Sequence, residues 1–155
     1  MAFLLGFFVL FSGGVQANPT LAAQYLQQTK DHFQLTKAYY EVGRTYSIAG
    51  NATAAVIYFQ SAYTGALRIT ASANDLYREN LDTLSRGQYR NLQYQQLAVS
   101  YSDQLRAQAK TLSVYLSILI QSPLSSTARL NVETKVMQIT QLLLQLEQAM
   151  RLAQA

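Results

Sequence analysis

The side chains that could do chemistry are few in this sequence of 155 residues, and they are scattered along it. The chain has no cysteine and a single histidine, His32, which stands beside Asp31 without a Glu-x-x-His partner. This composition excludes thiol catalysis, disulfides, thiolate-bound metals and the di-iron sites of helical bundles. A glycine-rich phosphate loop and a Gly-x-Ser-x-Gly motif are also missing from the sequence. We therefore expect a protein that is not an enzyme and that binds no cofactor or metal.

The densest group of ionisable residues lies between Asp75 and Arg90. Opposite charges recur there four residues apart, as at Asp82 and Arg86, so they share one face of a helix. This pattern is typical of a solvated helix surface with weak internal ion pairs. We expect a solvated helix face rather than an acid–base site.

Arginine and tyrosine are interleaved at the end of this charged segment, at Arg86, Tyr89, Arg90 and Tyr94. Such side chains stack on the bases of single-stranded nucleic acid, and they are equally enriched at protein interfaces. Acidic residues lie alongside, which favours a protein partner or self-association over nucleic acid. We interpret these four residues as candidate partner contacts.

The elements that position these residues are predicted to be helices throughout. Apolar residues recur three and four apart, and alternation typical of strands is absent over any useful length. Turn and cap signals divide the chain, with Asn51 or Thr53 as one cap and Ser125 or Ser126 as another. The breaks are short, which implies antiparallel neighbours. The sequence predicts an all-α fold, an antiparallel array of about four long helices, over roughly 19–49 with a possible break near Asp31, 52–84, 88–121 and 126–155.

The last of these helices has the most regular apolar pattern. Its apolar residues follow a four-three spacing that forms the seam of a coiled-coil-like packing: Val132, Val136, Ile139, Leu143, Leu146 and Met150. Leu142 and Leu144 widen this face, which favours a bundle helix that packs within its own chain. The alternative is a seam that packs against another chain.

A helical pair is predicted between residues 39 and 62. One face of its first helix carries Tyr39, Val42, Gly43 and Tyr46, and we expect both tyrosines in the core. Gly43 disfavours a helix by about 1 kcal/mol relative to alanine, which indicates close approach of the partner helix. That partner presents a small-large-small face made of Ala55, Phe59 and Ala62. Tyr40 falls off the first stripe and is expected to be exposed or to contact a neighbouring helix.

This order of aromatic, Val-Gly, tyrosine, then alanine, phenylalanine and alanine resembles a single tetratricopeptide repeat over about residues 36–69. The resemblance implies a helix-turn-helix unit whose first helix binds an extended peptide along its inner face. By that resemblance Lys37, Tyr40 and Arg44 are candidate partner contacts. The alternative is an ordinary pair of antiparallel helices that reached the same spacing through packing.

Residues 1–17 contain no charged side chain. Phe3 to Phe11 form an apolar run, and Val15-Gln16-Ala17 resembles a signal-peptidase site. The run is too short to span a bilayer. We predict a signal peptide over 1–17 and a single all-α domain over 18–155 without a transmembrane span. The alternative is a first buried helix of the fold.

An exported helical chain without cysteine is typical of a bacterial cell envelope, so a periplasmic or secreted location is expected. The sequence is interpreted as a non-enzymatic exported scaffold or adaptor that mediates protein–protein interaction through tetratricopeptide-like surfaces. The alternative interpretation is a structural subunit of a larger envelope-associated assembly that packs through its C-terminal helix.

Overall fold

A computed structural model of the protein describes residues 19–155. Four helices make up this part of the chain: α1 (Pro19–Ile48), α2 (Ala52–Ser85), α3 (Leu92–Gln121) and α4 (Ser126–Gln154). The described residues contain no strand, so the predicted all-α array of four long helices is confirmed. Within residues 19–155 no helix has a stretch long and apolar enough to cross a membrane. The predicted signal peptide lies outside the described residues.

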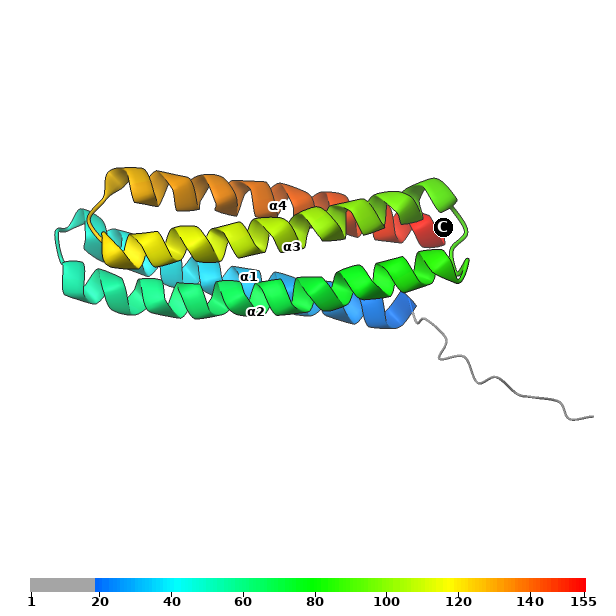
Figure 1. The fold of residues 1–155 in the computed structure, drawn as a ribbon, viewed down its shortest axis with the longest axis horizontal. Coiled ribbons are helices and arrows are strands. Elements are labelled where there is room, and N and C mark those ends of the chain that lie inside the picture. Colours follow the sequence, from blue (N-terminus) through cyan, green and yellow to red (C-terminus); the bar gives the residue numbers. More distant parts are fainter. Residues whose placement is uncertain (1–18) are drawn as a thin grey trace, which may run out of the picture.

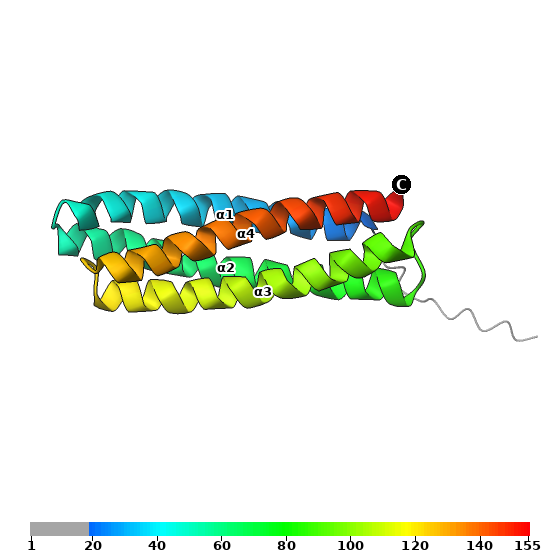
Figure 2. The ribbon, with the colours of Figure 1, turned by 90° about the horizontal axis from the view of Figure 1, so that it is seen from above.

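The four helices run alternately up and down, and each packs along the next (Figure 1). Helix α4 returns to lie beside α1, as the view from above shows (Figure 2). The backbones of α1 and α4 come close over only a short stretch, unlike those of the consecutive pairs. The array is therefore a four-helix bundle with three tight seams and one wider seam, between α1 and α4.

Short polar side chains start three of the helices. The Asn51 side chain accepts the Ala54 N–H at 3.0 Å, and the Ser125 hydroxyl accepts the Ala128 N–H at 3.2 Å. These bonds satisfy N–H groups that lack partners in a first helical turn, and they confirm two of the predicted caps. Helix α3 begins later than predicted, because Asn91 caps it. No break occurs at Asp31.

The apolar seam of α4 packs inside its own chain. Its residues Val132, Ile139 and Leu146 are fully buried, and Met150 packs against the core. The interpretation of α4 as a bundle helix is confirmed, and this seam is not available to another chain. Of the two leucines expected to widen the seam, Leu142 is buried, but Leu144 is 61% exposed on the outer side of the helix. The rest of the core is made of alanine, leucine, isoleucine and aromatic side chains, and all four helices contribute to it.

The buried face of α1 differs from the predicted one. Tyr46 is 37% exposed and stacks on Tyr58 at the surface, with ring centroids 5.6 Å apart, and Tyr39 is only partly buried. Tyr40 is 1% exposed and occupies the core position instead. The prediction was wrong because three polar residues complete the buried face, so the apolar pattern pointed to the neighbouring stripe. These residues are Thr29, Thr36 and Ser47.

Glycine allows α1 and α2 to approach closely. A Cβ atom at Gly43 would lie 2.7 Å from the Phe59 ring, so close that the ring or the helix would have to shift. Phe59 is fully buried between Ala55 and Ala62, one turn away on either side. The predicted packing reason for Gly43 is confirmed. Gly65 of α2 faces the Thr36 side chain in the same way.

Candidate functional site

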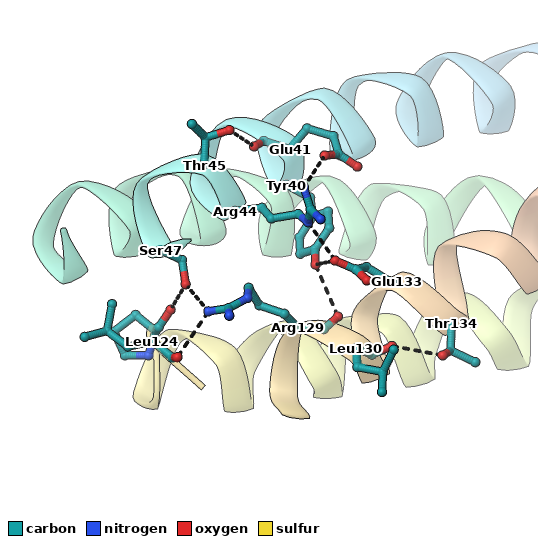
Figure 3. Close-up of polar contacts among 11 residues, drawn as sticks. Tyr40, Glu41, Arg44, Thr45, Ser47, Leu124, Arg129, Leu130, Glu133 and Thr134 are labelled. Carbon is teal, nitrogen blue, oxygen red and sulfur yellow. Dashed lines mark hydrogen bonds and ion pairs between the residues drawn. The ribbon is translucent and has the colours of Figure 1, made fainter. Parts of the chain in front are cut away.

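The wide seam between α1 and α4 is bridged by a polar cluster (Figure 3). The Tyr40 hydroxyl of α1 lies 3.1 Å from a Glu133 carboxylate oxygen and 3.2 Å from the Arg129 carbonyl oxygen, both on α4. The Arg44 Nε donates to the same Glu133 oxygen at 2.7 Å. One carboxylate thus accepts from a phenol and a guanidinium, and both donors come from α1 one helical turn apart.

The electrostatics of this cluster keep Tyr40 in its neutral form. Burial, reinforced by the negative charge and hydrogen bond of Glu133, raises the pKa of Tyr40 above its ordinary value of 10.0. The hydrogen bond and charge of Glu133 also raise the pKa of Arg44. The Tyr40 ring stacks on Phe59 with centroids 6.0 Å apart. Tyr40 therefore acts as a fixed hydrogen-bond donor that joins two helices.

A second set of bonds ties the end of α1 to the turn between α3 and α4. The Ser47 hydroxyl donates to the Pro123 carbonyl oxygen, and it accepts from Arg129 Nη1 at 2.6 Å. The same Arg129 nitrogen lies 3.1 Å from the Leu124 carbonyl oxygen. Because Arg129 also offers its own carbonyl to Tyr40, it links both sets of bonds. Side-chain hydrogen bonds therefore hold this end of the seam.

The opposite end of the α1–α4 seam opens into a cleft of about 470 Å³. Its floor comes from α2 and α3, where the Gln95 amide donates to the Asn80 carbonyl oxygen at 2.8 Å. The Thr83 hydroxyl at the floor is buried without a hydrogen-bond partner among the described residues. Lys30 and Glu147 pair at 2.9 Å on its edge. The volume and the uncharged floor fit a small molecule, but no group in the cleft selects a particular one.

The predicted partner contacts on α1 are placed differently from one another. Lys37 is exposed, Arg44 is partly exposed and already paired with Glu133, and Tyr40 is buried. Of the two alternatives expected for Tyr40, contact with a neighbouring helix is confirmed, since its side chain is buried and its hydroxyl is bonded to α4. Of the three residues, Lys37 offers the freest surface side chain.

The other predicted contacts lie around the turn between α2 and α3, at the opposite end of the bundle from the α1–α2 turn (Figure 1). Arg86 pairs with Asp82 at 3.2 Å, as the four-residue spacing predicted. The backbone N–H of Arg90 donates to the Ala153 carbonyl oxygen at 2.9 Å, which ties this turn to the end of α4. Tyr89 and Tyr94 are half-buried. The structure therefore does not join this group and Lys37 into one surface.

The outward face of α4 carries a feature that sequence analysis missed. Leu130, Met137 and Leu144 are 60%, 65% and 61% exposed, and they are seven residues apart. We call these three residues the outer stripe of α4. Gln141 and Gln148 are exposed on one side of the stripe, and on the other side Met137 borders a hollow that is also lined by Lys37, Glu41 and Glu133. The seven-residue recurrence was a readable signal, but the stronger inward pattern of the same helix hid it.

Among residues 19–155 no group of three or more acidic or histidine side chains could hold a metal ion. Comparison with protein-family models, curated proteins and solved structures found no match for this chain. The resemblance to a tetratricopeptide repeat thus stays a prediction.

Proposed function

We propose that this protein is an exported, non-enzymatic helical scaffold or adaptor that binds another protein through an outer helix face. The observation that carries the proposal is the outer stripe of α4. Large apolar side chains in a row on an exposed helix face are unfavourable in water, and a partner that covers them gains their burial. Methionine and leucine also adapt to different partner shapes.

The hairpin of α1 and α2 supplies a second candidate surface, and it carries the tetratricopeptide resemblance. Val42, Tyr46 and Ile57 are all exposed there, and Tyr46 is held rigidly against Tyr58. A stacked, partly exposed tyrosine is a common anchor at protein interfaces because it buries a large area at small entropic cost. This surface supports an adaptor that contacts partners on more than one face.

A structural subunit of a larger envelope-associated assembly is the second candidate function. The observation that favours it is the position of the outer stripe on the C-terminal helix, opposite the seam that faces the core. In that case α4 packs with its inner face against its own bundle and with its outer stripe against the next subunit. The two functions differ in whether the complex is permanent.

Export rests on the uncharged, apolar residues 1–17 and their signal-peptidase-like end. Intact mass of the chain isolated from its own cells tests it directly. A mass that begins at Asn18, in protein recovered outside the cytoplasm, is the expected result. A mass that still includes residues 1–17 contradicts cleavage, and recovery in the cytoplasm contradicts export.

Isolation of the native complex tests the scaffold function. The tagged chain is purified from the cell envelope as wild type, as Met137→Glu, and as Val114→Glu, a control at 49% exposure on α3, which belongs to neither candidate surface. The wild type and the control are expected in a complex heavier than one chain, and Met137→Glu is expected to elute alone while remaining fully helical. A wild-type chain that elutes alone contradicts the proposal.

A further inference from the structure

Buried polar atoms without partners lie at the end of the bundle where the cleft opens between α1 and α4. Thr83 is 2% exposed and lines the cleft, and its hydroxyl makes no hydrogen bond among the described residues. The other such side-chain atom within residues 19–155 is Oε1 of Gln88, whose backbone N–H donates to the Thr83 carbonyl oxygen at 3.0 Å. Buried groups of this kind are rare because they cost stability, so each one needs an explanation.

Two buried amides complete the floor of the cleft beside Thr83. Asn80 and Gln95 are joined by the bond from the Gln95 amide to the Asn80 carbonyl oxygen at 2.8 Å. Their side-chain oxygens, Oδ1 of Asn80 and Oε1 of Gln95, accept no hydrogen bond from the described residues. The floor therefore offers two acceptors and a hydroxyl that both donates and accepts.

Apolar side chains from α1 and α4 form the walls of the cleft. Ala22 and Leu26 of α1 are buried, and Met150 of α4 packs against the core. Methionine adapts to ligands of different shape, because its side chain is unbranched and polarisable. The cleft of about 470 Å³ lies within the range of about 300–1,000 Å³ that small-molecule sites occupy. A ligand with an apolar body gains the burial of that body between these walls.

The charged residues of the cleft lie on its edge. Lys30 and Glu147 neutralise each other in an ion pair at 2.9 Å, and Arg151 is exposed to solvent. The floor carries no charge, so a charged ligand group placed there would lose its water without gaining a counter-ion. An apolar group is disfavoured there as well, because it would leave the polar atoms of the floor unpaired. The part of a ligand that reaches the floor is therefore uncharged and polar.

We infer that this cleft binds a small uncharged amphiphile, with an amide or alcohol at one end and a short apolar body. The amide or alcohol donates to the side-chain oxygens of the floor and accepts from the Thr83 hydroxyl, and the apolar body lies between Leu26 and Met150. No single floor group selects such a molecule, but the three together define its class. The site is separate from the outer stripe of α4, so the inference goes beyond the proposed function and does not depend on it.

Phenylacetamide is the probe, and phenylacetate is its charged counterpart of similar shape. Nuclear magnetic resonance of isotope-labelled methionine methyl groups in the purified full chain reports where each one binds. Met150 lines the cleft, whereas Met137 lies on the outer stripe and serves as an internal control. The two signals are assigned with Met137→Leu and Met150→Leu.

The amide is expected to shift the Met150 signal with a Kd on the order of 1 mM and to leave the Met137 signal unchanged. The carboxylate is expected to bind at least about tenfold more weakly, because its charge is not matched at the floor. Equal binding of the two compounds, a shift confined to Met137, or no shift at Met150 would overturn the inference.

Thr83→Val tests the floor, because it removes the hydroxyl and keeps the shape of the side chain. That hydroxyl has no partner within the described residues, so the variant is expected to unfold at a higher urea concentration than wild type. It is also expected to weaken binding of phenylacetamide at least about fivefold. A purely structural role of Thr83 would not move stability and binding in opposite directions, and unchanged binding would overturn the role of this hydroxyl.

Thr36→Val is the matched control for this substitution. Thr36 is also buried, but its hydroxyl donates to the His32 carbonyl oxygen at 2.7 Å, and it does not line the cleft. The control is expected to lose stability and to bind phenylacetamide as wild type does.

Ala22→Leu tests the location of the site in a second way, because the larger side chain fills the cleft from α1. This variant is expected to remain helical by circular dichroism and to lose the shift of Met150 with phenylacetamide. A helical variant that still shows the shift would overturn the assignment to this cleft. Failure of the ligand site would leave the scaffold function untouched, since that function is tested at Met137 on the outer stripe.

Discussion

Helix α1 has two neighbours, and it contacts them in different ways. Against α2 the contact is close and depends on small residues: Gly43 lies on the Phe59 ring, and Gly65 lies on a threonine of α1. A buried hydrogen bond between the hydroxyls of Thr29 and Ser72, at 2.9 Å, lies in the same seam. The side chains of α1 and α2 pack closely in this seam, and the two backbones lie near each other.

Against α4 the same helix uses long polar side chains. Lys30 reaches Glu147, and Arg44 and Tyr40 reach Glu133, across a seam whose backbones come close only briefly. A cleft opens at one end of this seam. Close packing therefore stabilises the α1–α2 pair. Helix α1 is joined to α4 mainly by side-chain hydrogen bonds and ion pairs, each of which is weak on its own. We expect mutations in the two seams to differ in size accordingly.

The largest effect is expected at Phe59 in the tight seam. Phe59→Ala removes a fully buried ring and should lower the free energy of unfolding by about 3–5 kcal/mol. Urea unfolding followed by circular dichroism measures it. Leu35→Ala, at 45% exposure on α1, is the control and should change stability little.

The substitution Gly43→Ala tests the same contact more sharply. Its effect on the free energy of unfolding should change sign when the Phe59 ring is removed. Gly43→Ala should destabilise the wild type, because its Cβ meets the Phe59 ring. In the Phe59→Ala background the ring is gone and only the Tyr58 Cβ, at 3.2 Å, stays close, so the gain in helix propensity of up to about 1 kcal/mol should make the same change stabilising. Destabilisation of equal size in both backgrounds would show that the ring is not what requires glycine at this position.

Gly65 is expected to rank second. Its Cβ would meet the Thr36 side chain, with Thr36 Cβ itself at 3.2 Å, so overpacking of about 1–3 kcal/mol opposes the gain in helix propensity. Gly65→Ala should be net destabilising, and Thr36→Ala should recover part of the loss. Additive effects in the double variant, measured by urea unfolding, would contradict a direct clash.

Tyr40 in the wide seam is expected to have a smaller effect. Tyr40→Phe keeps the ring but deletes the hydroxyl that contacts Glu133, which should cost about 0.5–1.5 kcal/mol at neutral pH. Because Glu133 keeps Arg44 as a partner, its charge is not left alone. Urea unfolding of the two proteins gives the difference.

The same variant should alter the dependence of stability on pH. The pKa of Tyr40 is higher in the folded chain than its ordinary value of 10.0, so the folded state holds this proton more tightly than the unfolded state. The associated stability is fully present below pH 10 and is lost as the pH rises above that value. Wild type should therefore lose stability more steeply than Tyr40→Phe in alkali. Parallel curves above pH 10 would contradict the burial of this phenol.

The smallest effect is expected at the Lys30–Glu147 pair. Both side chains are partly exposed, so Lys30→Gln should change stability by less than about 1 kcal/mol, and added salt should reduce even that difference. A loss of unfolding free energy as large as that at Phe59 would contradict this view. It would show that polar bridges stabilise the α1–α4 seam as much as packing stabilises the α1–α2 seam.

Sequence patterns predicted the helices because helix signals are local. Asn51 and Ser125 could be recognised as cap candidates from their own neighbourhoods, and Gly43 stood out as a residue that needs a packing reason. The inward seam of α4 was equally readable, since its four-three spacing continues over the whole helix. The turn between α2 and α3 was placed only approximately. The third helix was predicted to start near residue 88, whereas α3 starts at Leu92.

The sites were less predictable. Tyr40 lies 93 residues from Glu133 along the chain, and Lys30 lies 117 residues from Glu147. Nothing in either segment indicates the other, so the polar bridges appear only when the bundle places α4 beside α1. The buried threonines of α1 likewise made Tyr46 look like the core residue.

By itself, then, the sequence determined an all-α chain, the number of its long helices and the inward face of α4, because propensity, caps and apolar periodicity act within a few residues. Only the tertiary structure decided which face of α1 is buried, which polar groups pair across the wide seam, and that Leu130, Met137 and Leu144 remain exposed. These features depend on contacts between helices, and a helix with two apolar stripes can bury only one of them against its own bundle.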